Sequence, residues 1–220
     1  MKAFLWLLTF ITANIYAQPL IVVETSNFDI NGKGDSEEWK KADWLPLTNR
    51  EGKKAYETKL KMMYSDSGVY CLFYNADEKI TSTIKEDYSD LWKEDVDEVF
   101  FWTDEKFPIY FEYEISPHNY ELPILVPNLN GKFLGWRPWH YTGDRVIKHA
   151  TEVREGSWTA EFFIPYKTLA PLTNVPPKKG TTWRCNMYRI DHDDGSSEWS
   201  WKPVRTNFHD FEMFGMVKFE

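Results

Sequence analysis

The sequence contains few cysteines, no long basic block and almost no helical periodicity. Its 2 cysteines cannot form the dense disulfide framework of a small secreted fold, so a hydrophobic core must hold the chain together. Cys71 and Cys185 both lie in apolar, strand-like runs. Two states are open for them, because cysteine is often a small buried hydrophobe: a pair of free thiols or a single disulfide.

Positive charge is also in short supply. The chain of 220 residues has 26 Lys and Arg against 34 Asp and Glu, a formal net charge of −8. Binding to a phosphate backbone needs a concentrated basic surface, which this sequence does not provide. Nucleic acid is therefore not an expected partner.

Long apolar runs are absent apart from residues 3–11, which follow Lys2. This run is too short to cross a bilayer, which takes about 20 apolar residues. Together with Ala17 just before Gln18, it is typical of a cleaved secretory signal. We expect residues 1–17 to be removed. Residues 18–220 should then form one monomeric domain, secreted or periplasmic, with no membrane span.

Aromatic residues, in contrast, are abundant, with 11 Trp, 12 Tyr and 15 Phe. One core of this size needs fewer rings, so we expect some of them to face a ligand. Trp39, Trp44, Trp158 and Trp183 lie in segments that predict core positions instead.

Apolar and polar residues alternate with a period of two along most of the chain, which predicts strands with one buried face. Residues 58–64 and 69–75 alternate in this way around Ser65-Asp66-Ser67-Gly68, and they predict a β-hairpin. Further strands are predicted at residues 96–103, 109–116, 146–154, 158–164, 183–191, 198–201 and 215–219. About nine or more such strands make an all-β, antiparallel, jelly-roll-like sandwich.

Residues 117–144 are rich in proline and glycine and show no sustained period, which predicts a long functional loop. The loop carries Trp136 and Trp139 on either side of Arg137. These three residues are candidates for contact with a ligand. Two short helical pieces are predicted elsewhere, at residues 35–42 and 166–169.

Several segments, in chain order, resemble the family 9 carbohydrate-binding modules, which are DOMON-like sandwiches. They are Asp29-Ile30-Asn31-Gly32, Met63-Tyr64-Ser65-Asp66-Ser67-Gly68-Val69-Tyr70, Leu91-Trp92-Lys93-Glu94-Asp95-Val96-Asp97-Glu98-Val99-Phe100, Trp158-Thr159-Ala160-Glu161-Phe162-Phe163-Ile164-Pro165, Trp183-Arg184-Cys185-Asn186-Met187-Tyr188-Arg189 and Phe208-His209-Asp210-Phe211-Glu212-Met213-Phe214-Gly215. The third is similar to the family signature Trp-x-x-Asp-x-x-Glu-x-Phe, and the fourth to Trp-Thr-x-Glu-x-x-Ile-Pro. Because they follow one another in the family's order, the resemblance spans most of residues 18–220.

The resemblance implies a site that holds the end of a sugar chain between two aromatic rings. The rings correspond to Trp92 and Phe208, the carboxylate between them to Glu98, and an amide donor to Asn207. Two positions depart from the family, since Phe208 replaces a second Trp and Glu112 falls where the family has Arg. A pyranose has an apolar C–H face and a fringe of hydroxyls, so rings combined with a few fixed polar groups suit it.

The function implied by the resemblance is non-catalytic binding of a poly- or oligosaccharide, with no cofactor. Such binding would support polysaccharide catabolism alongside a separate glycoside hydrolase.

An enzyme remains an alternative. Asp95, Asp97 and Glu98 could form the acid pair of a glycoside hydrolase with Glu112 or Glu114, although alternating acids on strands are more often solvated.

Two cofactor alternatives also remain. Some sandwiches related to this family hold haem, and His209 with Met213 or Met216 could serve as its ligands. Structural calcium could be held by Asp66 or by Asp191-His192-Asp193-Asp194-Gly195, although these residues are more typical of turns.

Overall fold

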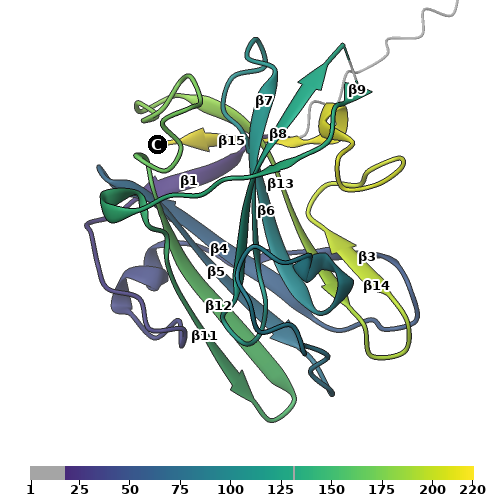
Figure 1. Ribbon diagram of the computed structural model, residues 1–220. Coiled ribbons are helices and arrows are strands. Elements are labelled where there is room, and N and C mark those ends of the chain that lie inside the picture. Colours follow the sequence, from purple (N-terminus) through teal and green to yellow (C-terminus); the bar gives the residue numbers. More distant parts are fainter. Residues whose placement is uncertain (1–17, 131) are drawn as a thin grey trace, which may run out of the picture.

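The computed structural model describes residues 18–130 and 132–220, and the predicted signal lies outside these ranges (Figure 1). Two facing sheets account for most of the strands. Sheet A contains β10 (Arg137–Pro138), β8 (Glu121–Leu129), β7 (Ile109–Ile115), β6 (Val96–Trp102), β13 (Thr182–Asp191) and β15 (Gly215–Phe219), in that spatial order. Sheet B contains β4 (Thr58–Tyr64), β5 (Gly68–Ala76), β12 (Ser157–Pro165) and β11 (Lys148–Arg154). The arrangement confirms the predicted all-β sandwich.

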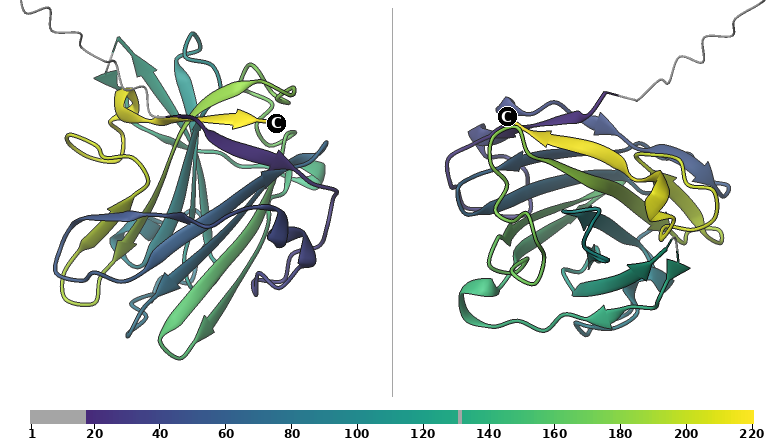
Figure 2. Two further views of the ribbon diagram at one scale, coloured as in Figure 1. Left: turned by 180° about the vertical axis from the view of Figure 1, so that it is seen from behind. Right: turned by 90° about the horizontal axis from the view of Figure 1, so that it is seen from above.

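Strand β1 (Leu20–Glu24) connects the two sheets. Its first residues pair in parallel with β15 of sheet A, and Val23 and Glu24 pair in parallel with β4 of sheet B. The C-terminal strand β15 consequently lies beside the first strand (Figures 1 and 2). Short strands complete the edges: β2 (Leu45–Pro46) and β3 (Thr48–Glu51), β9 (Lys132–Phe133) and β14 (Ser197–Ser200).

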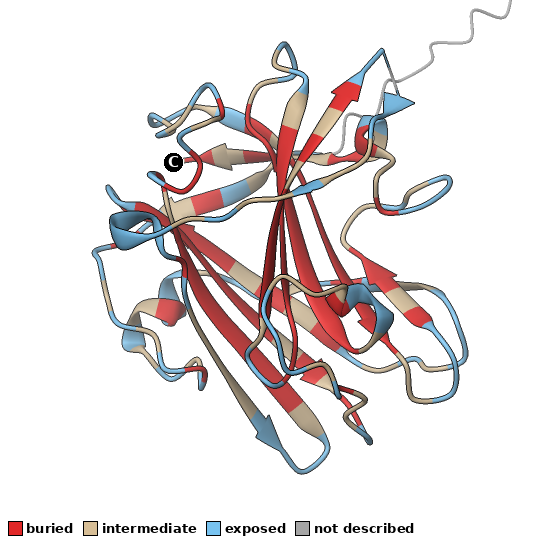
Figure 3. Ribbon diagram, viewed as in Figure 1, coloured by how far each residue is buried: buried red, intermediate tan, exposed pale blue. Residues whose placement is uncertain are grey.

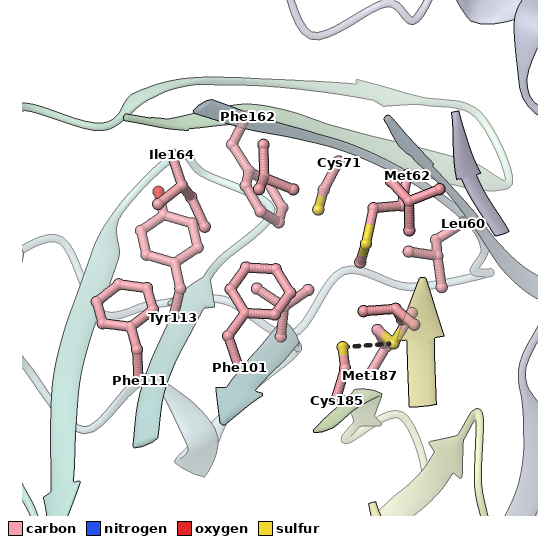
Figure 4. Packing of buried hydrophobic residues seen from close by; sticks show 14 of the residues in the cluster. Leu60, Met62, Cys71, Phe101, Phe111, Tyr113, Phe162, Ile164, Cys185 and Met187 are labelled. Atoms are coloured by element: carbon pink, nitrogen blue, oxygen red, sulfur yellow. Dashed lines mark hydrogen bonds between the residues drawn. The ribbon is translucent and has the colours of Figure 1, made fainter. Parts of the chain in front are cut away.

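The core fills the space between the sheets. Side chains of β4, β5 and β12 point toward those of β6, β7 and β13 in Figure 4, where Met62, Phe162 and Phe101 are among the contacts. The strands that carry them are buried along most of their length, while the connecting loops are exposed (Figure 3). Trp158 and Trp183 belong to this core, as predicted.

Both cysteines are free and buried on facing sheets. Cys185 lies beside Met187, with 3.5 Å between the two sulfur atoms (Figure 4). Burial raises the pKa of both thiols, so they stay protonated and behave as small apolar side chains. The structure thus selects the free-thiol alternative for Cys71 and Cys185.

The predicted hairpin is confirmed as β4 and β5, and η1 (Glu37–Lys41) confirms a short helix near residues 35–42. Residues 166–169, predicted as a single helical turn, form hydrogen-bonded turns in which the Leu169 N–H donates to the Tyr166 carbonyl at 3.1 Å. Trp44 is also not in the core. Its side chain is 40% exposed, and Lys59 and Lys61 place their ammonium groups over its ring.

The prediction of one long loop at residues 117–144 is wrong, because strand β8 occupies Glu121–Leu129. Pro123 and Pro127 obscured the strand in the sequence. The backbone of both prolines faces away from β7. On that side the Pro123 carbonyl accepts from the Trp139 N–H and the Pro127 carbonyl accepts from the Leu134 N–H, and the N–H that each proline lacks would point the same way. Proline is tolerated on that side, because no ladder hydrogen bond to the main sheet is lost.

No helix among the described residues is long and apolar enough to cross a membrane.

A buried guanidinium connects the sheets at one end of the sandwich. Arg189 on β13 is fully buried, and its Nη1 donates to Thr58 Oγ1 at 3.0 Å and to the Ala76 carbonyl at 2.8 Å. Its Nη2 donates to Asp77 at 3.1 Å and to Asp191 at 2.6 Å. A buried charge is tolerated when opposite charges and hydrogen bonds surround it, as they do here.

Replacing Arg189 by Met should therefore destabilise the protein strongly. The change leaves the buried Asp77, Asp97 and Asp191 without their cation, and breaking such a pair costs about 3–5 kcal/mol. Urea unfolding would measure the loss. Arg205→Met is the control, because the Arg205 side chain is 57% exposed and its ion pairs lie at the surface. Equal stability of the two variants would contradict this account.

Candidate functional site

A second apolar cluster covers the face of sheet A that points away from sheet B. Its buried members include Phe100 on β6, Tyr110 on β7, Ile124 on β8, Tyr188 on β13 and Phe208 from the segment before η4 (Phe211–Met213). The outer face of a sandwich sheet is usually polar. A buried apolar layer at this position indicates that loops and a binding site cover the sheet.

A pocket of about 400 Å³ opens into this layer. Its lining comes from β6, β7, β8 and β13 of sheet A and from the surrounding short strands and loops: Arg50, Glu51, Trp92, Glu98, Phe100, Glu112, Glu114, Leu122, Ile124, Phe133, Trp136, Ile190, Glu198, Thr206, Asn207, Phe208 and His209. The volume is within the range of about 300–1,000 Å³ typical of small-ligand pockets. Aromatic, aliphatic and acidic side chains are combined in one cavity.

Three glutamates form the floor of the pocket. Glu98 on β6 is directly opposite Glu114 on β7, and Glu112 is two residues before Glu114 on the same face. The exposed fractions of Glu98, Glu114 and Glu112 are only 2%, 1% and 3%. Strand alternation puts Glu98 and Phe100 on the pocket face, and Val99 and Phe101 in the core between the sheets.

Burial raises the pKa of each of these carboxyls above its ordinary value, that of Glu112 to about 8. The negative charges of Glu112 and Glu198 raise the pKa of Glu98 further. The neighbouring carboxyls of Glu112 and Glu114 also interact, which lowers the pKa of Glu112 and raises that of Glu114. At neutral pH, the three carboxyls of the empty site therefore retain protons and carry fewer than three negative charges.

Trp92 forms one wall of the pocket. It lies in η2 (Leu91–Lys93), where the neighbouring Leu91 is 1% exposed and anchors the turn in the outer apolar cluster. The Trp92 backbone N–H donates to Glu114 at 3.1 Å, while the Trp92 side chain is 46% exposed. An exposed indole at a pocket is available for stacking on a ligand.

Phe208 forms a second wall, and it is held more tightly. Its ring stacks on Tyr188 with the centroids 4.0 Å apart and the planes at 10°. The Tyr188 hydroxyl also donates to the Phe208 carbonyl at 3.0 Å. On its other side, the Arg50 guanidinium lies 5.7 Å from the ring centroid.

The structure brings together five of the seven site residues predicted from the sequence. Trp92, Glu98, Asn207, Phe208 and Trp136 all line the pocket. Asn207 is exposed, and its side-chain oxygen accepts from the His209 backbone N–H at 2.9 Å.

Arg137 and Trp139 do not line the pocket. Arg137 is exposed on β10 and donates to the Trp136 carbonyl. Trp139 packs against the core between the sheets, and its Nε1 donates to the Thr168 carbonyl at 2.9 Å. Their position near Trp136 in the sequence did not predict their position in space.

The pocket also contains residues that the sequence reasoning did not propose as ligand contacts. Arg50 pairs with Glu198 and comes from β3, which joins the site only because β3 pairs with β14. No local pattern marks Arg50. Glu114 could have been found, since the alternation of Tyr110, Glu112 and Glu114 places all three on one face.

Three of the acids proposed for a hydrolase, Glu98, Glu112 and Glu114, lie together on the pocket floor, and the other two lie elsewhere. Asp95 accepts from the backbone N–H groups of Thr81 and His192, and Asp97 accepts from Asn75 at 2.7 Å. Neither lines the pocket. Asp95 and Asp97 therefore hold neighbouring segments together by hydrogen bonds and are not available to a ligand in the pocket.

Only one of the residues proposed as haem ligands lines the pocket. His209 lines the pocket, but Met213 and Met216 do not. The His209 Nδ1 is 2.7 Å from the Tyr110 hydroxyl, and its ring stacks on Phe133. Burial lowers the pKa of His209 to about 4, so its ring is neutral at pH 7.

One group of carboxylates in the described residues is compact enough to hold a metal ion. Asp77, Asp191 and Asp193 each offer an oxygen, and these atoms lie within 4.8 Å of one another. Oxygen ligands suit calcium, although the Arg189 guanidinium already donates to two of the three. Asp66, the other candidate, accepts from Asn27 and Ser67 within its turn.

Comparison with known proteins agrees with this geometry. No curated protein is detectably similar in sequence. A candidate carbohydrate-binding protein from Bacteroides uniformis has a TM-score of 0.76 and 16% identity, over 92% of this chain and 99% of that one. A family 9 carbohydrate-binding module from Caldicellulosiruptor kristjanssonii, solved with cellotriose, has a TM-score of 0.70 and 16% identity, over 92% and 94%. The same module solved with glucose has a TM-score of 0.70 and 16% identity, over 92% of this chain and 96% of that one.

The family model described as carbohydrate family 9 binding domain-like matches residues 30–220. This range contains every residue of the pocket and both sheets apart from β1. The chain therefore belongs to the carbohydrate family 9 binding domain-like family and is a non-catalytic carbohydrate-binding protein.

Proposed function

We propose that the pocket on sheet A binds the terminal residue of an oligosaccharide between the rings of Trp92 and Phe208. Glu98 and Asn207 would contact the hydroxyls of the sugar. The observation that carries the proposal is that two aromatic walls and buried carboxyls meet in one pocket of about 400 Å³. The rings match the apolar faces of a pyranose, and the polar groups match its hydroxyl edge.

The solved module from Caldicellulosiruptor kristjanssonii supports this proposal, because it was crystallised with cellotriose and with glucose. A bound glucose is a single residue. A pocket of about 400 Å³ on the outer face of sheet A suits such a ligand better than it suits the middle of a long chain.

Trp92→Ala should weaken glycan binding without destabilising the fold. Stacking contributes about 0.5–1.5 kcal/mol beyond the burial of area, so we expect a loss of tenfold or more. Calorimetry with ligands selected on a glycan array would measure it. Trp44→Ala is the matched control, since Trp44 is 40% exposed against 46% for Trp92 but lies outside the pocket.

Trp158→Ala completes the comparison. Trp158 is fully buried in the core, and truncating such a residue costs about 3–5 kcal/mol. Its melting temperature should fall well below that of Trp92→Ala. Unchanged affinity in Trp92→Ala, or a fall in its melting temperature as large as that of Trp158→Ala, would place Trp92 in the structural core rather than in the site.

Binding to a chain end predicts a specific dependence on ligand length. Affinity should change by less than about twofold between trimer and hexamer, because the added residues lie outside the pocket and bury little further surface. Calorimetry on a length series with one kind of linkage would test this. A steady rise in affinity with length would instead favour an open groove that extends past Trp136.

We propose further that the protein is exported and keeps sugar chains near separate glycoside hydrolases. Lys2, the apolar run at residues 3–11 and Ala17 support export. Mass spectrometry of the protein from its source cell should find Gln18 at the N-terminus. An intact residue 1–17 segment on a cytoplasmic protein would contradict export.

A further inference from the structure

The charges of the pocket are unbalanced. Five glutamates line it, among them Glu98, Glu112 and Glu114 on the floor. Arg50 is the one Lys or Arg among the lining residues, and it pairs with Glu198 and lies 3.9 Å from Glu51. His209 is neutral at pH 7 because burial lowers its pKa to about 4. The three carboxyls of the floor therefore have no cation of their own among the described residues.

One acceptor on the floor is also unsatisfied. Glu112 is 3% exposed, and its Oε2 has no hydrogen-bond partner among the described residues. The closest charged or titratable nitrogen is the His209 Nδ1 at 3.7 Å, which is too far for a hydrogen bond and is engaged by the Tyr110 hydroxyl. Leaving such an atom buried and unpaired is costly, so the pocket favours a ligand that donates to it.

The three common kinds of sugar differ in what they offer this floor. A uronic acid brings another carboxylate, which buried glutamates repel. A neutral sugar offers hydroxyls that both donate and accept. A sugar with a free amine offers an ammonium group, which has three donors, no acceptor and a positive charge. The rings of Trp92 and Trp136 at the same pocket attract a cation through their faces.

We propose that the pocket selects glycan ends that carry a free ammonium group, such as a 2-amino sugar, over neutral ends, and rejects uronic acids. The proposal rests on the glycan-binding function above and specifies its ligand. Among the floor residues, Glu112 would act as the main acceptor for the ammonium group.

The protonation of the floor gives this proposal a measurable signature. Burial raises the pKa of Glu112 to about 8, so its carboxyl holds a proton in the empty site at pH 7. A bound ammonium stabilises the ionised form, and the site then releases protons to solvent. Affinity for an amino sugar should therefore rise with pH below about 8, by up to about tenfold per unit for one linked proton, until the amine itself deprotonates.

Calorimetry on the full chain would compare oligomers of glucosamine, N-acetylglucosamine, glucose and glucuronic acid, matched in length. Repeating each titration in two buffers of different ionisation enthalpy counts the protons released. We expect the glucosamine oligomer to bind at least about tenfold more tightly than the glucose oligomer at pH 7, since a hydrogen bond to a charged group contributes about 1.5–3 kcal/mol. Of the four oligomers, only glucosamine should release protons when it binds.

Glu112→Gln should reduce both the preference for the amine and the proton release, because one ionisable acceptor is lost. Glu121→Gln is the matched control: Glu121 is also buried, at 6% exposure, and its pKa is raised to about 7, but it lies outside the pocket. This variant should keep the full preference for the amine.

Equal affinity for the glucosamine and glucose oligomers, without proton release, would overturn the amine proposal and leave the glycan-binding function intact. A preference that persists unchanged in Glu112→Gln would overturn the role of that residue. If no oligomer binds in a way that depends on Trp92, the glycan-binding function at this pocket fails together with the amine proposal.

Discussion

The alternation of side chains along β6 and β7 is the constraint on which both the core and the site depend. Val99 and Phe101 point into the space between the sheets, while Glu98 and Phe100 point into the pocket. A slip of one residue in register would exchange the two sets and place the acids in the core. The hairpin-like pairing of β6 with β7, and of β6 with β13 on its other side, fixes that register.

The same constraint forces the protein to bury acidic groups on both sides of sheet A. Between the sheets, burial raises the pKa of Asp97 well above its ordinary value, while the nearby Arg189 and a hydrogen bond from Asn75 act in the opposite direction. On the pocket side, Glu98 and Glu114 have no such cation, and they retain protons instead. Removing a charge by protonation is the usual response of a carboxyl that cannot be paired. Arg189 therefore offsets part of the cost of burying acids between the sheets, whereas the acids of the pocket depend on protons that a ligand can displace.

The sequence predicts the fold well because the fold depends mainly on local alternation. The hairpin of β4 and β5 and the strands β6, β7, β12, β13 and β15 all follow a period of two that is visible in one segment at a time. The sequence does not predict strand β8, because Pro123 and Pro127 are unusual inside a strand. They are tolerated because their backbone faces away from β7, and this depends on which strands lie beside β8. The parallel pairing of β1 with β15 and β4 joins segments that are far apart in the sequence, so no local pattern predicts it.

The site was predictable only where one segment carries the information. Trp92 with Glu98, and Asn207 with Phe208, lie in two segments that resemble those of the family, so the resemblance implied both pairs. Trp136 and Trp139 looked equivalent in the sequence, but only the first lines the pocket, because Trp139 turns to the core and donates to Thr168. The contribution of Arg50 depends on strand β3 reaching β14 from a distant part of the chain.

The two aromatic walls differ in how they are supported, and this difference connects the rings to the acids. Phe208 is fixed by apolar stacking on Tyr188, which does not change with protonation. The turn that carries Trp92 is held by a hydrogen bond from its backbone to Glu114, one of the three carboxyls that share protons. An ionised carboxylate is a stronger acceptor than a protonated one, so a ligand that draws protons from the floor also tightens the hold on Trp92. Recognition of charge at Glu112 and stacking at Trp92 are thus linked through Glu114, the neighbour of Glu112 on the same face of β7.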